Sequence, residues 1–122
     1  MATFSVTPQA SPLGSKLVEV AALNNSVCQN VTGGAGTLFM VEIDNTANGG
    51  YPVFVKIFDD AAAVLATTEP DFILKADGGK KITYVMPEPP AFAALSSACV
   101  KEKANSGTTS PDASVKVRFL TS

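Results

Sequence analysis

The feature that most constrains the fold is a series of short apolar runs separated by clusters of turn-forming residues. The runs are rich in β-branched and aromatic residues, and the separators include GGAG, NTANGG, ADGG and NSGTTSPD. This alternation is typical of sandwiches and jelly rolls. We therefore predict an all-β fold, an antiparallel β-sandwich or jelly roll of about eight strands. The predicted strands span Lys16–Leu23, Ser26–Val31, Thr37–Asp44, Val53–Asp59, Phe72–Lys75, Lys81–Met86, Leu95–Glu102 and Val115–Thr121.

The alternation of side chains within a run predicts which residues face the core, because successive residues of a strand point to opposite faces. In Thr37–Asp44 the apolar face contains Phe39, Val41 and Ile43. In Val53–Asp59 both faces are apolar apart from Lys56. Such a two-faced strand is either central or covered by something outside the domain.

The N-terminal residues differ in character from these runs. Phe4 and Val6 stand between small polar residues, and Pro8 and Pro12 follow. We predict an extended N-terminal arm over residues 1–15 and a single domain over residues 16–122. Phe4, Val6 and Phe92 lie outside the clear strands, so we take them as candidate contacts with a partner.

Length and charge limit the partners to be expected. The chain has 122 residues, is 46% hydrophobic and carries a net charge of -2, which suits one compact folded domain. It has no cluster of Lys and Arg to neutralise phosphates, so we expect neither nucleic acid nor a membrane as partner. The opening residues show no secretory signal pattern, and we expect a protein made in the cytoplasm.

The residue types argue against an enzyme. The chain contains no His, which excludes nucleophilic sites that depend on a His base. The carboxylates of Asp59, Asp60, Glu69 and Asp71 occupy turn positions, where acids often cap backbone groups. A paired-acid active site or a calcium site built from them is the alternative. We expect no catalysis, no cofactor and no metal.

Cys28 and Cys99 are the only cysteines, and each lies in a strand-like run. In a reducing compartment we expect buried free thiols that pack as small hydrophobic side chains. A disulfide between the two sheets of the sandwich is the alternative. Neither a CxxC spacing nor a His is present to suggest a zinc site.

The loop DNTANGG, between two strong strands, raises the question of whether it binds something. We predict a turn, in which Asn48, Gly49 and Gly50 supply a reversal with positive φ. Asp44, Asn45 and Thr46 would cap backbone groups through their side chains.

The chain beyond Gly36 contains a characteristic series of turns and strands. DNTAN precedes the strand PVFVKIFD, a TTEPD turn and a Gly-Gly hairpin follow, and AFAAL and SGTTSPD come before the last strand. In these features it resembles small structural proteins of tailed bacteriophages. The resemblance implies a virion protein without enzymatic activity, a capsid decoration or cement protein that assembles as a homotrimer on the head surface. Its partner would be the major capsid protein.

Two other functions remain open on the sequence. The same sandwich could serve as a tail, neck or fibre-base subunit of a virion. From a different class, it could be a carbohydrate-binding module or adhesin, although such modules favour exposed aromatic platforms and the chain has no Trp and only Tyr51 and Tyr84.

Overall fold

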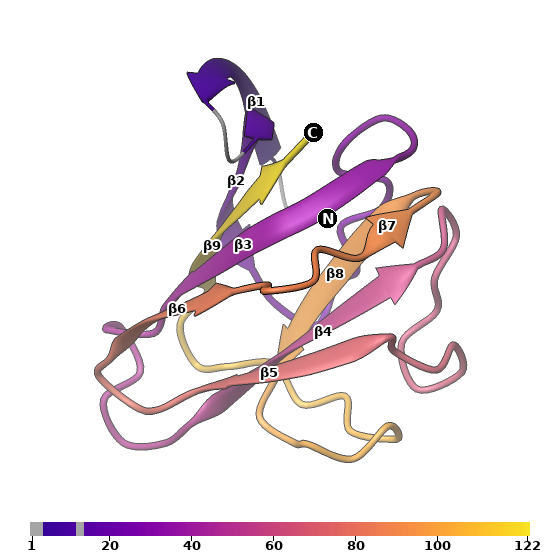
Figure 1. Cartoon of the computed structure of the whole chain (residues 1–122). Coiled ribbons are helices and arrows are strands. Elements are labelled where there is room, and N and C mark those ends of the chain that lie inside the picture. The colour runs from indigo at the N-terminus through magenta and orange to yellow at the C-terminus, as the bar shows by residue number, and fades with distance from the viewer. Residues whose placement is uncertain (1–3, 12–13) are drawn as a thin grey trace.

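The structure is a computed structural model that describes residues 4–11 and 14–122, and within them it is all-β with no helix (Figure 1). The all-β prediction is thus confirmed. The nine strands are β1 (Phe4–Ser11), β2 (Gly14–Leu23), β3 (Gly36–Asp44), β4 (Val53–Asp59), β5 (Phe72–Ala76), β6 (Lys81–Val85), β7 (Ala91–Phe92), β8 (Leu95–Val100) and β9 (Val115–Thr121).

The strands form two antiparallel sheets that pack face to face. The larger sheet has the order β1-β2-β9-β3-β6, with the short β7 on β3, and the smaller has the order β5-β4-β8. A bridge between Cys28 and Ser97 adds one more pairing to the outer side of β8. The order β2-β9-β3-β6 opposite Cys28-β8-β4-β5, with the chain passing back and forth between the sheets, is a jelly-roll topology.

The hydrophobic core lies between the sheets. The central strand β9 contributes Val115, Val117 and Phe119, all fully buried, to the side of the larger sheet. Burial of each such side chain is worth roughly 1.5–3 kcal/mol relative to exposure. The opposing sheet contributes the alternate residues of β4, β5 and β8, among them Val53, Val55, Ile57, Ala76, Leu95 and Cys99.

Two strand predictions need correction. The pairing of β3 with β9 shifts register between Leu38 and Met40, so Leu38 is buried in place of the predicted Phe39, while Val41 and Ile43 face the core as predicted. The predicted strand Ser26–Val31 is reduced to the bridge at Cys28. Asn30 in this segment has a φ of 47°, which a continuing strand does not accept.

Strand β4 is central in its sheet, and its outer face is covered by the chain itself. Phe58 on that face packs with Ala63 and Ala98 in a second buried cluster, and Lys56 is also fully buried. Of the two explanations for an apolar strand with two buried faces, the structure shows the central position. No cover from outside the domain is needed at this strand.

Residues 4–11 of the predicted arm form β1, which pairs with β2 at the edge of the larger sheet. In Figure 1 β1 lies at the top of the view, beside β2. Residues 1–3 and 12–13 of the predicted arm lie outside the described residues.

Candidate functional site

The first candidate surface is the edge formed by β1. Phe4 lies opposite Val20 and Val6 lies opposite Val18 in the register, so the four side chains share the core-facing side of the sheet. Val18 and Val20 are fully buried, whereas Phe4 is 45% exposed and Val6 is 41% exposed. The difference follows the strand order, because β1 is the edge strand of the larger sheet whereas β2 lies between β1 and β9.

The same strand leaves one side of its backbone without a strand partner. β1 pairs only with β2, and the sequence has no charged residue before Lys16. Natural edge strands are commonly protected by charges, bulges or Pro, and here Pro8 and the register shift between Pro8 and Ser11 are the protections present. We call this surface, made of Phe4, Val6 and the outer backbone of Phe4–Ser11, the β1 edge.

Phe92 lies elsewhere in the molecule and is only 7% exposed. It belongs to β7, which pairs with the start of β3 so that Phe92 lies opposite Gly36. A Cβ added at Gly36 would lie 3.1 Å from the Phe92 ring, so the glycine makes room for it. The structure therefore brings Phe4 and Val6 together but places Phe92 in the core, where little of its surface can reach a partner.

The cysteines are buried in the same layer of the sandwich. The backbone of Cys28 forms an isolated β-bridge with Ser97 on β8, and Cys99 lies two residues further along that strand. They are present as thiols with no disulfide, so the inter-sheet bond considered from the sequence is not seen. Burial raises the pKa of Cys99 to about 12 and also raises the pKa of Cys28. A thiol with a raised pKa is a poor nucleophile at neutral pH.

Asp59 and Asp71 lie next to each other at one end of the sandwich, where β4 ends and β5 begins. Asp71 Oδ2 accepts a hydrogen bond from the Asp59 backbone N at 2.6 Å. Asp59 Oδ1 accepts from the backbone N of Ala93 at 2.8 Å and of Ala94 at 3.1 Å. Both acids thus cap backbone groups, which agrees with the turn role and leaves no Asp positioned beside a second catalytic group among the described residues.

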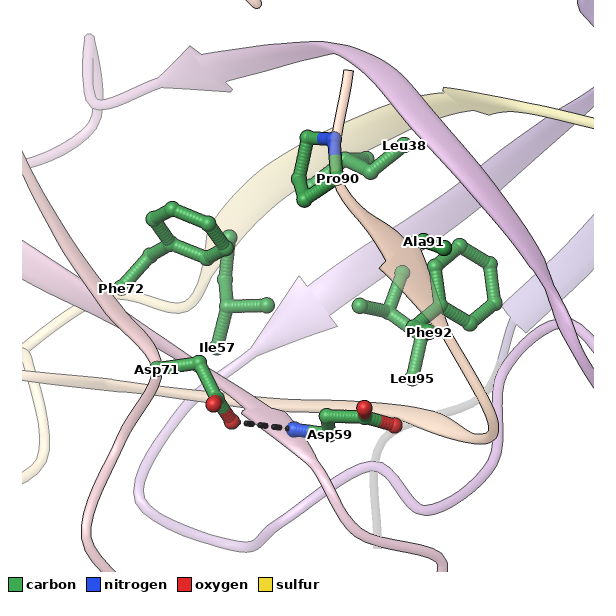
Figure 2. A pocket seen from close by; sticks show the side chains of 9 residues that line it. All are labelled: Leu38, Ile57, Asp59, Asp71, Phe72, Pro90, Ala91, Phe92 and Leu95. Atoms are coloured by element: carbon green, nitrogen blue, oxygen red, sulfur yellow. Dashed lines mark hydrogen bonds between the residues drawn. The ribbon is translucent and has the colours of Figure 1, made fainter. Parts of the chain in front are cut away.

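These two acids lie at the mouth of a pocket of about 190 Å³ between the sheets. Figure 2 shows the rings of Phe72 and Phe92 on either side of it and, below them, the Asp71 carboxylate at the Asp59 backbone nitrogen, with the Asp59 carboxylate extending to the other side. Most of the lining is apolar. The lining residues are Leu38, Ile57, Asp59, Asp71, Phe72, Pro90, Ala91, Phe92 and Leu95.

Lys56 has a structural role that the sequence did not reveal. Its Nζ donates to the carbonyl oxygens of Ala104 at 2.5 Å, Asn105 at 3.3 Å and Gly107 at 3.2 Å. The ammonium group has three hydrogens, so these three carbonyls of the 104–107 turn use the full donor capacity of Lys56. Burial lowers the pKa of Lys56, and the negative charge of Glu102 opposes the shift.

The DNTANGG loop is a structural junction. Asn45 Nδ2 lies within hydrogen-bonding distance of the carbonyl oxygens of Tyr51, Ala76 and Asp77, at 3.2–3.3 Å. Asp44 Oδ1 accepts from the backbone N of Thr46 at 3.1 Å, while the Thr46 hydroxyl donates to the same oxygen and caps no backbone group. The capping prediction thus holds for Asp44 and Asn45 and is wrong for Thr46.

Asn48 connects this loop to the segment before β9. Its Oδ1 accepts from the backbone N of Ala113, and its Nδ2 donates to the Ala113 carbonyl, both at 2.9 Å. The predicted positive φ at Asn48, Gly49 and Gly50 is wrong, because none of the three has a positive φ. The glycine with a positive φ beside this loop is Gly79, in the neighbouring turn. Gly79 N donates to the carbonyls of both Asn45 and Asn48.

The described residues show neither a metal-binding cluster nor a membrane-spanning helix. Residues 4–11 and 14–122 contain no group of three or more His, Cys, Asp or Glu side chains placed to hold a metal ion. In the same part of the chain, no helix is long and apolar enough to cross a membrane. Comparison with protein-family models, curated proteins and solved structures found no match to the chain.

Proposed function

We propose that this chain is a non-enzymatic structural protein of a tailed-phage virion, a capsid decoration or cement protein that stabilises the head shell by bridging major capsid subunits. It would act on the head surface as a homotrimer. The observation that carries this proposal is the β1 edge, because one side of its backbone has no strand partner among the described residues and its two apolar side chains remain exposed.

The chemistry of the β1 edge suits attachment to another chain. An exposed edge strand can accept a further strand through main-chain hydrogen bonds, and pockets for alternate side chains then give specificity. Phe4 and Val6, 45% and 41% exposed, would be the alternate side chains that become covered. A strand added here would extend the larger sheet beyond β1.

Cement action would then be mechanical. Each copy contributes a modest contact, and a trimer that touches several capsid subunits sums those contacts through multivalency. The jelly roll supplies a rigid body between the contacts, because its core is buried on both sides of β4. Resistance to internal pressure would come from buried area and would require no chemical step.

The aromatic residues do not favour the carbohydrate-binding alternative. Tyr51 has Lys101 Nζ 4.5 Å above its ring, and its hydroxyl donates to Asn48. Tyr84 donates its hydroxyl to the carbonyl of Lys75. Both rings are only partly exposed. Tail, neck or fibre-base placement shares every feature of the β1 edge, and copy number per particle separates it, since a head-shell protein is far more abundant.

The test is the double substitution Phe4→Ser with Val6→Ser. Its matched control is Val64→Ser, which removes an apolar side chain that is 56% exposed and lies in the loop between β4 and β5, two strands of the other sheet. We expect the double variant to remain folded by circular dichroism, to lose trimer formation in light scattering and to bind capsids depleted of this protein at least tenfold more weakly. The control should behave as the parent protein. Equal binding by all three proteins would refute the proposed role of the β1 edge.

A further inference from the structure

We propose that the pocket between the sheets is a binding site for an unbranched aliphatic chain that ends in an ammonium group. A lysine side chain of a partner segment and a free alkylamine share this chemistry. The proposal rests on the size, lining and charge of the pocket and is independent of the β1 edge.

The size of the pocket limits its occupant. Its volume is about 190 Å³, below the roughly 300–1,000 Å³ that is usual for drug-sized ligands. A single long side chain or a short alkyl chain is therefore the scale of ligand that fits. The pocket adjoins a more open depression that shares Phe72 and Pro90 and also includes Met86, Pro87 and Glu88. The backbone of a partner segment would have space there.

The apolar residues that line the pocket favour a ligand with an aliphatic chain. Leu38 and Ile57 form the base from opposite sheets, and Phe72, Pro90 and Phe92 surround the opening in Figure 2. Leu38 and Ile57 are each 1% exposed, so the base is part of the core. A methylene chain laid against these groups would leave water without loss of any hydrogen bond, which is favourable.

The carboxylates of Asp59 and Asp71 in the pocket lining favour a ligand with a positively charged end. Asp59 Oδ1 and Asp71 Oδ2 are bonded to backbone N–H groups, while Asp59 Oδ2 and Asp71 Oδ1 have no hydrogen-bond partner among the described residues. None of the ion pairs found in residues 4–11 and 14–122 includes either acid. The backbone bonds hold the two carboxylates in place, and their remaining oxygens can accept from an ammonium group.

The local sequence strengthens this charge. Residues 57–74 contain four acids, Asp59, Asp60, Glu69 and Asp71, and no Lys or Arg. The preceding Lys56 is directed to the carbonyls of another loop. A cation at the pocket mouth would therefore meet an uncompensated negative region.

The experiment is a titration of the ¹⁵N-labelled full chain with n-hexylammonium, followed by amide chemical shifts, with 1-hexanol as the neutral probe of equal chain length. We expect hexylammonium to shift the resonances of Asp71, Phe72 and Ala91 and to bind several times more tightly than hexanol. Equal affinity for the two probes, or shifts centred elsewhere on the protein, would overturn the proposal.

Two variants test the site. Asp59→Asn with Asp71→Asn keeps Oδ1 as an acceptor and removes both charges, and we expect roughly tenfold weaker binding of hexylammonium from two surface ion pairs. Ala91→Leu, at an exposed lining position, should fill the pocket and abolish binding of both probes. Thermal unfolding of each variant checks that the fold is intact.

The matched control is Asp60→Asn with Glu69→Gln, which removes the same charge from residues that do not line the pocket. It should bind hexylammonium nearly as the parent does, and an equal loss would mean general charge attraction and would refute the site. N-acetyl-lysine-N-methylamide and its norleucine counterpart distinguish the sources. Preferential binding of the lysine compound assigns the site to a partner's side chain, whereas binding of hexylammonium alone assigns it to free alkylamines.

Discussion

The Tyr51 hydroxyl donates to Asn48 Oδ1 at 2.8 Å and accepts from the backbone N of Asp112 at 2.7 Å. Two residues of one loop thus hold the segment that leads into β9, more than sixty positions away along the chain. The loop that first suggested a binding site is therefore occupied by the protein's own backbone.

This junction predicts a graded effect of substitution. Asn48→Ala removes a side chain that is 3% exposed and leaves the Ala113 backbone without its partners, so we expect a loss of about 2–4 kcal/mol in the free energy of unfolding. Tyr51→Phe removes one hydroxyl and should cost about 1 kcal/mol. Thr46→Ala, at an exposed position, is the control and should change stability by less than about 0.5 kcal/mol. Urea denaturation measures all three, and the reverse order of effects would contradict the role of Asn48.

A second prediction concerns the backbone beside that loop. A Cβ at Gly78 would lie 2.8 Å from both the N and the O of Tyr51, whereas a Cβ at Gly50 would meet nothing within 4 Å. Gly78→Ala should therefore destabilise the fold by at least about 2 kcal/mol, and Gly50→Ala should be close to neutral. Thermal unfolding of the two variants distinguishes them. Equal midpoints would show that the Tyr51 backbone moves aside at little cost.

Replacement of Lys56 tests the buried ammonium. Lys56→Met keeps a buried apolar stem of similar length but leaves the carbonyls of Ala104, Asn105 and Gly107 without their donor. We expect a loss of about 2–4 kcal/mol, with the 104–107 turn the first region to lose protection in hydrogen exchange. Lys116→Met, on an exposed cation of β9, is the comparison and should cost less than about 1 kcal/mol. Unchanged protection of the turn in Lys56→Met would contradict its anchoring by the ammonium group.

The buried thiol of Cys99 predicts a dependence of stability on pH. Burial raises its pKa in the folded protein to about 12 from an ordinary value of 9.0, so the folded state binds more protons between these values. The contribution of the protonated Cys99 thiol to the free energy of unfolding is complete below pH 9.0 and is lost as the pH rises toward about 12. Above pH 9.0 the stability difference between the parent and Cys99→Ala should fall by about 1.4 kcal/mol per pH unit. Denaturation at pH 8 and pH 10 measures it, and a constant difference would show that the thiol is ionised equally in both states.

Reaction with a thiol reagent gives an independent measure. Both cysteines are fully buried with raised pKa values, so we expect slow labelling in the folded protein and rapid labelling of two thiols in denaturant. Rapid labelling of the native protein would mean that the edge near Cys28 opens readily. Absence of two reactive thiols after denaturation would mean that a disulfide had formed.

The sequence predicted the core-facing residues well where apolar and polar residues alternate without interruption along a strand. Val41 and Ile43 were assigned to the core because apolar residues alternate along that run, and both are fully buried. The bulge after Leu38 could not be predicted, since one extra residue reverses the face of every residue on one side of it and has no marker in composition. The predicted strand Ser26–Val31 is reduced to a single bridge because Asn30 has a positive φ. The Asn30 backbone N donates to the Ser96 hydroxyl on β8, a contact that the local sequence does not reveal.

The candidate sites were less predictable for a similar reason. Phe4 and Val6 were identified from their setting outside the strong runs, but their exposure depends on the position of β1 at the edge of the larger sheet. Phe92 had the same signal and is nevertheless buried, because Gly36 admits its ring. The partners of Lys56 and the pairing of Asp59 with Asp71 depend on contacts between separate loops, which no local pattern encodes.

The central place of β9 has a consequence for the order of events in folding. Val117 pairs with Val20 on one side and with Ile43 on the other, so the larger sheet cannot be continuous until the last strand of the domain is available. During synthesis, β2 and β3 would emerge long before the strand that joins them. Such non-local pairing is slow, on the order of milliseconds to seconds. We therefore expect nascent chains that end before Val115 to lack cooperative structure and to be the species most exposed to aggregation.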